Sequence, residues 1–212
     1  MGLKEFIPFF KEEKKEIPDR RDELRTLQDK IKIYEMIIER YREYIERSEA
    51  KTITDLKLLV RPNDEIIQRK KDELIQNMRP YVYDQNFLQA AELAHNFIRE
   101  IRTCNIAIDF WLTPKEMMTL RGGDPMDKAV FLCSLFIALE NQDSFVIVGV
   151  DKGIKAGVGF TFNNEFYMID PASSAHAKGE KEKIIGEWFK EDKRIYEFND
   201  RDYSEIRTEE TG

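Results

Sequence analysis

The stretch TPKEMMTLRGGDPMDKAVFLCSLFIAL, residues 113–139, decides the fold of this 212-residue chain. Its first part predicts a short helix, because Thr113 can cap a helix, Pro114 suits the first helical position and Glu116 completes a capping box. We expect this helix to end at about Leu120. The two glycines that follow should then reverse the chain, since glycine adopts the positive φ angles that a tight turn requires.

A second helix is predicted directly after the glycines, and we expect it to form the centre of the domain. Asp124 caps it, Pro125 suits its first position, and Asp127 lies in its first turn, where the helix dipole favours a carboxylate. From Ala129 to Leu139 almost every residue is apolar. A helix that is apolar on all sides is buried on all sides.

These motifs give the chain a likeness to a known family. The pattern W-x-T-P-x-E at residues 111–116, then R-G-G-D-x-x-D-x-A at residues 121–129 and a long apolar helix, resembles the transglutaminase-like, papain-type cysteine-protease superfamily. In its prokaryotic branch the second motif usually reads R-G-G-D-C-E-D-x-A. The cysteine is the nucleophile, and the helix N-terminus stabilises its thiolate. Here Pro125 stands at the cysteine position and Met126 replaces the glutamate, so the resemblance implies that the nucleophile is lost.

The resemblance also places the other two members of the catalytic triad. In the family a histidine opens one strand and an aspartate ends the next, in the pattern H-x-W-x-x-x…W-Y-x-x-D-P. The segment FYMIDP, residues 166–171, matches the second half. Counting back thirteen positions from Asp170 puts the histidine at Gly157, to within one or two positions, and no histidine lies between His95 and His176. Of the three triad positions only Asp170 keeps its residue, and the likeness covers roughly residues 61–205.

The predicted fold class is α+β, with a helical N-terminal half, a long N-terminal helix, and a central buried helix packed on an antiparallel sheet, as in cysteine proteinases. Besides the central stretch, helices are predicted over residues 19–50, from the cap at Asp64 to about 78, over 86–102 and over 184–190, strands over 144–150, 155–162, 165–169 and 194–199, and a loop over 172–183. We divide the chain into an N-terminal tail and long helix (1–60), a transglutaminase-like domain (61–205) and an acidic tail (206–212), with fraying from about Asp200.

The long helix carries a heptad repeat. Its apolar residues alternate at spacings of three and four: Leu24, Leu27, Ile31, Tyr34, Ile38, Tyr41 and Ile45. Ile33, Ile37 and Tyr44 widen this stripe on one side. Such a helix can pack on its own domain, pair with a second copy as a homo-oligomer, or bind another partner. The apolar residues among the first ten predict either a small anchor for a partner or a membrane surface, or a tail that packs on its own domain or is disordered.

Composition excludes several classes of function. The net charge is −7, from 34 basic and 41 acidic residues, which argues against nucleic-acid binding because such binding requires basic patches. Only Cys104 and Cys133 are present, which indicates reduced thiols and a cytoplasmic protein. Lys4 and Glu5 interrupt the apolar N-terminus, so no signal peptide is predicted, and no apolar run is long enough to span a membrane.

Isolated reactive residues add little chemistry. His95 should lie on the polar side of its helix, and the sequence shows no metal-ligand spacing and no cofactor motif. Cys133 lies within the apolar helix and should be part of the core. Ser173, Ser174 and His176 follow Asp170 in a polar loop, but local clustering alone does not make a serine-type site. We expect the Asp170 carboxylate to accept backbone hydrogen bonds in an Asp-Pro turn.

The favoured function is that of a catalytically inactive transglutaminase-like pseudoenzyme that binds a protein or peptide as a scaffold module. The alternatives are a hydrolase or acyl transferase with a relocated nucleophile, and a structural protein that self-associates through its N-terminal helix. The family holds an extended acyl donor between the central helix and the histidine-bearing strand. The corresponding cleft would be walled by Trp111, Pro125 and Met126 on one side and by Gly157, Val158 and Phe160 on the other, and it could be open or filled by these side chains.

Overall fold

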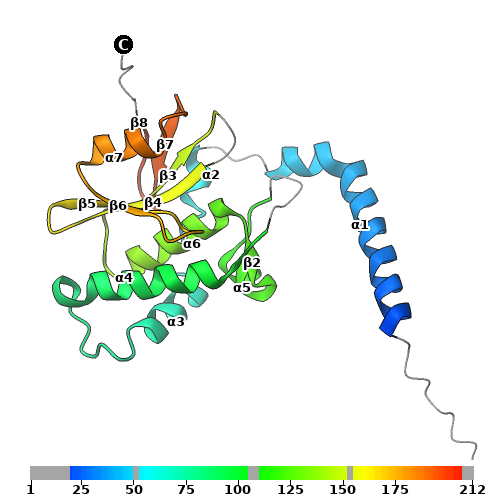
Figure 1. The fold of residues 1–212 in the computed structure, drawn as a ribbon, viewed down its shortest axis with the longest axis horizontal. Coiled ribbons are helices and arrows are strands. Elements are labelled where there is room, and N and C mark those ends of the chain that lie inside the picture. Colours follow the sequence, from blue (N-terminus) through cyan, green and yellow to red (C-terminus); the bar gives the residue numbers. More distant parts are fainter. Residues whose placement is uncertain (1–19, 50–52, 105–109, 152–154, 207–212) are drawn as a thin grey trace, which may run out of the picture. The chain divides into compact units, whose positions relative to one another are not determined.

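The fold is α+β, as the sequence predicts (Figure 1). A computed structural model describes residues 20–49, 53–104, 110–151 and 155–206. The chain forms two units, Met1–Ile45 and Glu46–Gly212. The boundary places residues 46–60, which we had assigned to the N-terminal region, with the second unit. Within the described ranges, none of the helices has the length and apolar character needed to cross a membrane.

The first unit is built on one helix. Helix α1 (Arg20–Glu49) is continuous over 30 residues and extends past the boundary of the unit. This confirms the single long helix predicted over residues 19–50. Residues 1–19, which include the apolar N-terminal tail, lie outside the described residues.

The second unit contains six helices among its described residues. They are α2 (Ile53–Lys57), α3 (Glu65–Leu74), α4 (Tyr83–Glu100), α5 (Pro114–Leu120), α6 (Pro125–Ala138) and α7 (Lys181–Trp188). Two of them depart from expectation: α2 lies after the long helix, where no helix was predicted, and α7 begins inside the predicted loop. Both are short, and helices of one or two turns leave only a weak apolar period in the sequence.

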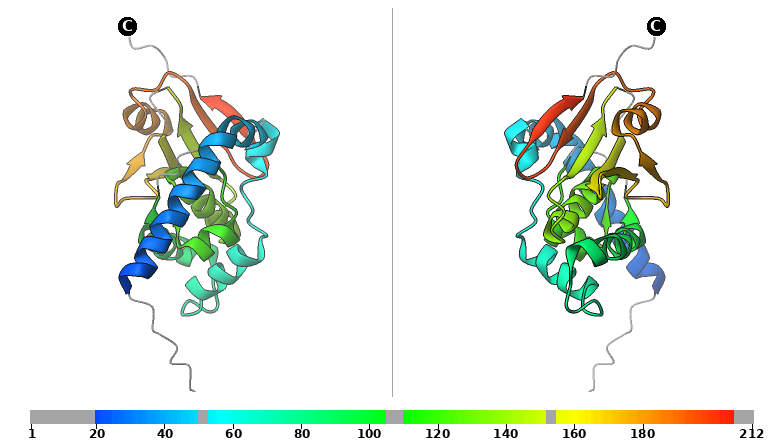
Figure 2. Two further views of the ribbon diagram at one scale, coloured as in Figure 1. Left: turned by 90° about the vertical axis from the view of Figure 1, so that its right-hand side faces the viewer. Right: turned by 90° about the vertical axis from the view of Figure 1, so that its left-hand side faces the viewer.

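The sheet of the second unit has six antiparallel strands in the order β6-β5-β4-β3-β7-β8 (Figure 1). The strands are β3 (Ser144–Gly149), β4 (Lys155–Phe162), β5 (Glu165–Ile169), β6 (His176–Gly179), β7 (Ile195–Phe198) and β8 (Tyr203–Ile206). Helix α6 packs on β3 and β4, with α3 and α4 against it, whereas α7 packs on β5 and β6 from the opposite face (Figure 2). Each face therefore buries its own apolar cluster, and the α6 face holds the larger one.

The two edge strands correct the sequence prediction. β6 lies in the predicted loop and pairs with β5, and β8 lies in the predicted frayed end and pairs with β7. Residues of both strands are mostly exposed or half-buried. Strands exposed in this way need no apolar alternation, so the pattern that reveals the central strands is missing from them.

The glycine elbow also differs from expectation. The residue with left-handed geometry is Arg121, with φ of 49°, and neither Gly122 nor Gly123 has a positive φ. Instead β2 (Gly122–Gly123) pairs in parallel with β1 (Arg102–Thr103). A Cβ atom on Gly122 would lie only 2.6 Å from the Cys104 Sγ atom. Glycine is required here for a close approach of two chain segments rather than for a turn.

Candidate functional site

The candidate site is the start of α6, where the resembling family carries its nucleophile. Pro125 occupies the first helical position, and Asp124 and Asp127 form a reciprocal capping box. The Asp127 amide donates to Asp124 Oδ1 at 2.7 Å, and the Asp124 amide donates to Asp127 Oδ2 at 3.1 Å. This confirms the capping residues read from the sequence and fixes the direction in which α6 leaves the elbow.

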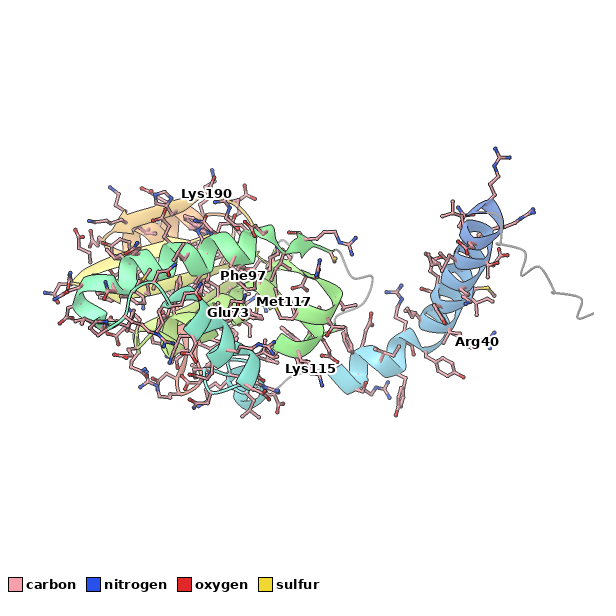
Figure 3. All side chains as sticks on the ribbon, turned by 90° about the horizontal axis from the view of Figure 1, so that it is seen from below. Arg40, Glu73, Phe97, Lys115, Met117 and Lys190 are labelled. Carbon is pink, nitrogen blue, oxygen red and sulfur yellow. The ribbon has the colours of Figure 1, made fainter. Side chains whose placement is uncertain are left out.

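The preceding helix is capped in the same way. The Glu116 carboxylate accepts from the Thr113 amide at 2.8 Å, and the Glu116 amide donates to Thr113 Oγ1 at 3.3 Å. Hydrogen bonds from Thr113 lower the pKa of Glu116. Met117 of α5, labelled in Figure 3, is 1% exposed and packs beside Gly123. The elbow between α5 and α6 is thus held by two capping boxes and a buried side chain.

Asp127 does more than cap the helix. Its Oδ1 atom also accepts from the Leu112 amide at 3.1 Å, which ties the segment before α5 to the N-terminus of α6. The carboxyl is buried, and its pKa is raised to about 7. Burial is the largest cause, the charge of Asp124 adds to it, and the hydrogen bonds from the two backbone amides oppose it. Asp127 can therefore exchange a proton near neutral pH, but its two oxygen atoms are already engaged by the main chain.

Lys128 is a buried charged residue at this site that was not predicted from the sequence. It is 1% exposed, although it sits in the first turn of α6, and its Nζ atom donates to Thr103 Oγ1 of β1 at 2.9 Å. Burial lowers the pKa of Lys128, while the charge of Asp170 opposes that effect. Its burial could have been predicted from its position, because it lies four residues before Leu132 on a helix that was expected to be buried on all sides. The ammonium group links α6 to the β1–β2 ladder.

His95 is not on a polar surface, which corrects the prediction. The ring is 8% exposed, and its Nε2 atom lies 2.8 Å from the Asp170 carbonyl oxygen and 2.9 Å from the Ser173 carbonyl oxygen. Both partners only accept hydrogen bonds, so Nε2 carries the proton and donates. Burial lowers the pKa of His95 and favours its neutral form. This ring anchors the Asp-Pro loop to α4.

Asp170 behaves as the sequence predicts. Its carboxylate accepts from the Ala172 amide at 2.7 Å, from the Ser173 amide at 3.2 Å and from the Ser173 hydroxyl at 2.8 Å. In a catalytic triad the carboxylate holds the ring of the histidine. Here the carboxylate holds a turn, and His95 binds the main chain of the same loop instead.

The remaining candidate nucleophiles do not gather at this site. Cys133 is fully buried in the middle of α6, as predicted, and burial raises the pKa of its thiol. The Ser173 hydroxyl donates to Asp170, and His176 Nδ1 lies 3.1 Å from the Ser174 carbonyl oxygen on the exposed edge strand β6. No three ligating side chains among the described residues form a group that could hold a metal ion.

The predicted cleft walls are largely core. A Cβ atom on Gly157 would lie 2.3 Å from Met168 Cε, in the cluster beneath α7, so position 157 faces away from α6. Only its neighbours Ala156 and Val158 face the α6 side, and neither is a histidine. Position 157, where the resemblance places the histidine to within one or two positions, therefore faces away from α6, and none of residues 156–158 is a histidine.

Two of the other predicted wall residues, Phe160 and Met126, are also buried. Phe160 is 2% exposed and packs with its ring centroid 5.4 Å from that of Phe87 and 5.1 Å from that of Phe136. Met126 is also buried, whereas Trp111 and Pro125 are half-buried. With these side chains in the core, Met126, Val158 and Phe160 do not offer the walls of an open trough to a peptide.

Comparison of the chain with family models, with curated proteins and with solved structures gave no match.

Proposed function

We propose that the second unit is a catalytically inactive transglutaminase-like domain that acts as a protein- or peptide-binding module. The observation that carries this proposal is Pro125 at the first position of α6. This is where the resembling family places the cysteine, and proline supplies neither a nucleophile nor an N–H group.

The polar groups around Pro125 support an inactive site because each is engaged in holding the fold. Asp127 binds two backbone amides, Lys128 binds Thr103, and His95 binds two carbonyl oxygens of the Asp-Pro loop. General acid–base catalysis requires a group free to transfer a proton to the substrate. These contacts leave the site with anchoring groups in place of catalytic ones.

An enzyme with a relocated nucleophile has less support. Cys133 is closed off from solvent, and its raised pKa disfavours the reactive thiolate. Cys104 is half-buried beside Gly122 and has a weak contact of 3.8 Å between its Sγ atom and the Arg102 carbonyl oxygen. It is the thiol that a test for acyl chemistry has to examine.

The binding surface we favour is the rim of the site rather than a trough. Of the predicted wall residues, Trp111 and Pro125 remain partly exposed, and the adjacent Phe110 is 36% exposed. Leu120, at the end of α5, is 59% exposed. Aromatic side chains of this kind are enriched at protein interfaces, where they supply rigid apolar contact area.

The catalytic part is tested by labelling thiols and assaying acyl chemistry in parallel. The wild type and the variants Cys104→Ser, Cys133→Ala and Pro125→Cys are treated with iodoacetamide, and peptide hydrolysis and amine incorporation are measured. Pro125→Cys should be alkylated fastest, because the helix N-terminus stabilises a thiolate there, and no variant should turn over substrate. Turnover by the wild type that Cys104→Ser abolishes would establish an enzyme and refute the proposal.

The binding part is tested with a matched pair of variants. Trp111→Ala removes the central side chain of the rim, whereas Leu88→Ala removes an apolar side chain, 41% exposed, from α4. Proteins cross-linked to the wild type should be retained by Leu88→Ala and lost with Trp111→Ala. Equal retention by both variants would rule out this rim as the binding surface.

A further inference from the structure

The apolar face of α1 is exposed within its own unit. We call the seven residues of its heptad stripe the seam: Leu24, Leu27, Ile31, Tyr34, Ile38, Tyr41 and Ile45. The five that are most exposed have exposed fractions between 54% and 60%, and Ile38 and Ile45 are half-buried. Side chains project from α1 on all sides (Figure 3), and no second element of this unit is present among its described residues. A contiguous apolar face of this kind marks an interaction surface.

The spacing of the seam identifies the kind of partner. From Leu24 to Ile45 the seam follows three unbroken heptads. A stripe that packs on a globular domain follows the 3.6-residue period of a straight helix and drifts by about 20° per heptad from a strict seven-residue repeat. A sustained seven-residue repeat is instead typical of helices that coil around one another.

The residue types at the seam favour two parallel strands. Leu24, Ile31, Ile38 and Ile45 fall at the a positions of the heptad, and Leu27, Tyr34 and Tyr41 fall at the d positions. β-Branched residues at a with leucine at d favour parallel dimers, a pattern that three of the four a positions and Leu27 follow and that the two tyrosines at d do not. Ile37 and Tyr44 fall at g positions, where they can cover the seam on one side.

The charges that flank the seam select one register. In a parallel pair with both helices in register, Lys30 at g faces Glu35 at e of the second helix, and no like charges face each other among the described residues. A shift of one heptad sets Lys30 against Arg42 and Glu23 against Glu35. An antiparallel pair in which the two seams overlap fully sets Arg21 against Arg42 and brings no acid to a base.

We propose that α1 pairs with α1 of a second copy of this chain as a parallel, in-register coiled coil, so that the protein is a homodimer. The seam is the interface, and the Lys30–Glu35 pairs, one on each side of the two-fold axis, fix its register. This inference does not depend on the proposed function of the second unit.

Sedimentation of the full chain tests the assembly. The wild type should sediment as a dimer of the 25.1 kDa chain, with a monomer fraction that grows on dilution. Ile38→Asp places a charge in the seam and should give a monomer. Met36→Asp is the matched control: it introduces the same charge two residues away, at an f position where Met36 is 65% exposed, and should remain a dimer. A wild type that is monomeric at all concentrations, or a trimer or tetramer, would overturn the proposal.

Charge exchange and cross-linking test the register and direction. Lys30→Glu should weaken the dimer roughly tenfold by replacing two attractive pairs with two repulsive ones, and the double variant Lys30→Glu/Glu35→Lys should restore wild-type affinity. In a chain carrying Cys104→Ser and Cys133→Ala, Ile31→Cys should form a disulfide between copies on oxidation, because equal a positions meet only in a parallel, in-register pair. Failure of the double variant to recover, or of the disulfide to form in a sedimenting dimer, would contradict this geometry.

Discussion

Helices α6 and α1 both carry apolar residues, but α6 is apolar on almost every side, whereas α1 carries an apolar stripe on an otherwise polar helix. In α6 twelve residues, from Met126 to Ile137, are buried, among them the charged Asp127 and Lys128. In α1 the seam residues Leu24, Ile31 and Tyr34 are all more than half exposed. The spacing of the apolar residues predicts both helices. From the contrast we infer that α6 is covered by its own chain, whereas the seven-residue period of α1 favours a covering surface from a second copy.

The difference between the two helices is tested first by removing apolar volume from each of them. Phe136→Ala in α6 should lower the free energy of unfolding by about 3–5 kcal/mol, since it opens a cavity beside Phe87 and Phe160. Tyr34→Ala in α1 should leave the unfolding of the second unit unchanged, although it should weaken dimerisation. Urea unfolding followed by the fluorescence of Trp111 and Trp188 reports on the second unit, and equal losses in the two variants would refute the distinction.

The pH dependence of stability sharpens the description of the α6 N-terminus. The pKa of Asp127 is raised to about 7 in the folded chain. Its protonated carboxyl therefore contributes fully to the free energy of unfolding at a pH below the pKa of the unfolded chain, and this contribution is lost as the pH rises through about 7. The loss is of the order of 4 kcal/mol for a shift of this size.

Asp127→Asn should remove this slope, whatever it does to the absolute stability, because asparagine does not titrate. The measurement is the free energy of unfolding in urea, determined between pH 4 and pH 8 for the wild type and for the variant. A wild-type profile parallel to that of the variant would show that the two backbone amides keep Asp127 ionised throughout.

A smaller effect is expected from the ring that holds the Asp-Pro loop. His95→Ala leaves two carbonyl oxygens without their donor and should cost about 1–3 kcal/mol. His95→Gln can still donate a hydrogen bond from its amide and should recover part of this loss. If His95→Ala unfolded at the same urea concentration as the wild type, the ring would not anchor the loop.

The smallest effect should come from the buried lysine. Lys128→Met keeps the length of the side chain and removes a buried charge, so the lost bond to Thr103 is offset and stability should stay within about 1 kcal/mol of the wild type. Lys128→Ala leaves a cavity as well and should cost more. Equal unfolding midpoints for the two variants would show that the side chain does not fill space in the core.

The sequence predicted those parts of the structure that depend on local interactions. The capping box of α5 and the Asp124 cap of α6 were predicted correctly because a cap involves residues three apart, whereas the part that Asp127 takes in a second capping box was not predicted. The hairpin between the strands predicted over 155–162 and 165–169 is also local, and both residues of its turn, Asn163 and Asn164, have positive φ angles. The long helix and the four inner strands follow from their apolar periods.

The features that were missed depend on contacts between distant residues. His95 contacts the loop at Asp170, 75 residues away, so nothing near it in sequence signals that it is buried. Gly122 is required by the Sγ atom of Cys104 rather than by its own turn. The predicted wall residue Gly157 faces away from α6, because alternate residues of a strand face opposite sides of the sheet. At the candidate site, the sequence named Pro125 and Asp170 but did not reveal Lys128.

Hydrogen exchange of the full chain at two concentrations, about 1 μM and about 100 μM, compares the two helices most directly. The central claim is that α6 is covered by its own chain and α1 by a second copy. Exchange of the α6 amides should then be slow and the same at both concentrations, whereas exchange of the α1 amides should slow as the concentration rises. If α1 exchanged at one rate at both concentrations, whether as fast as an isolated helix or as slowly as α6, the claim would be contradicted.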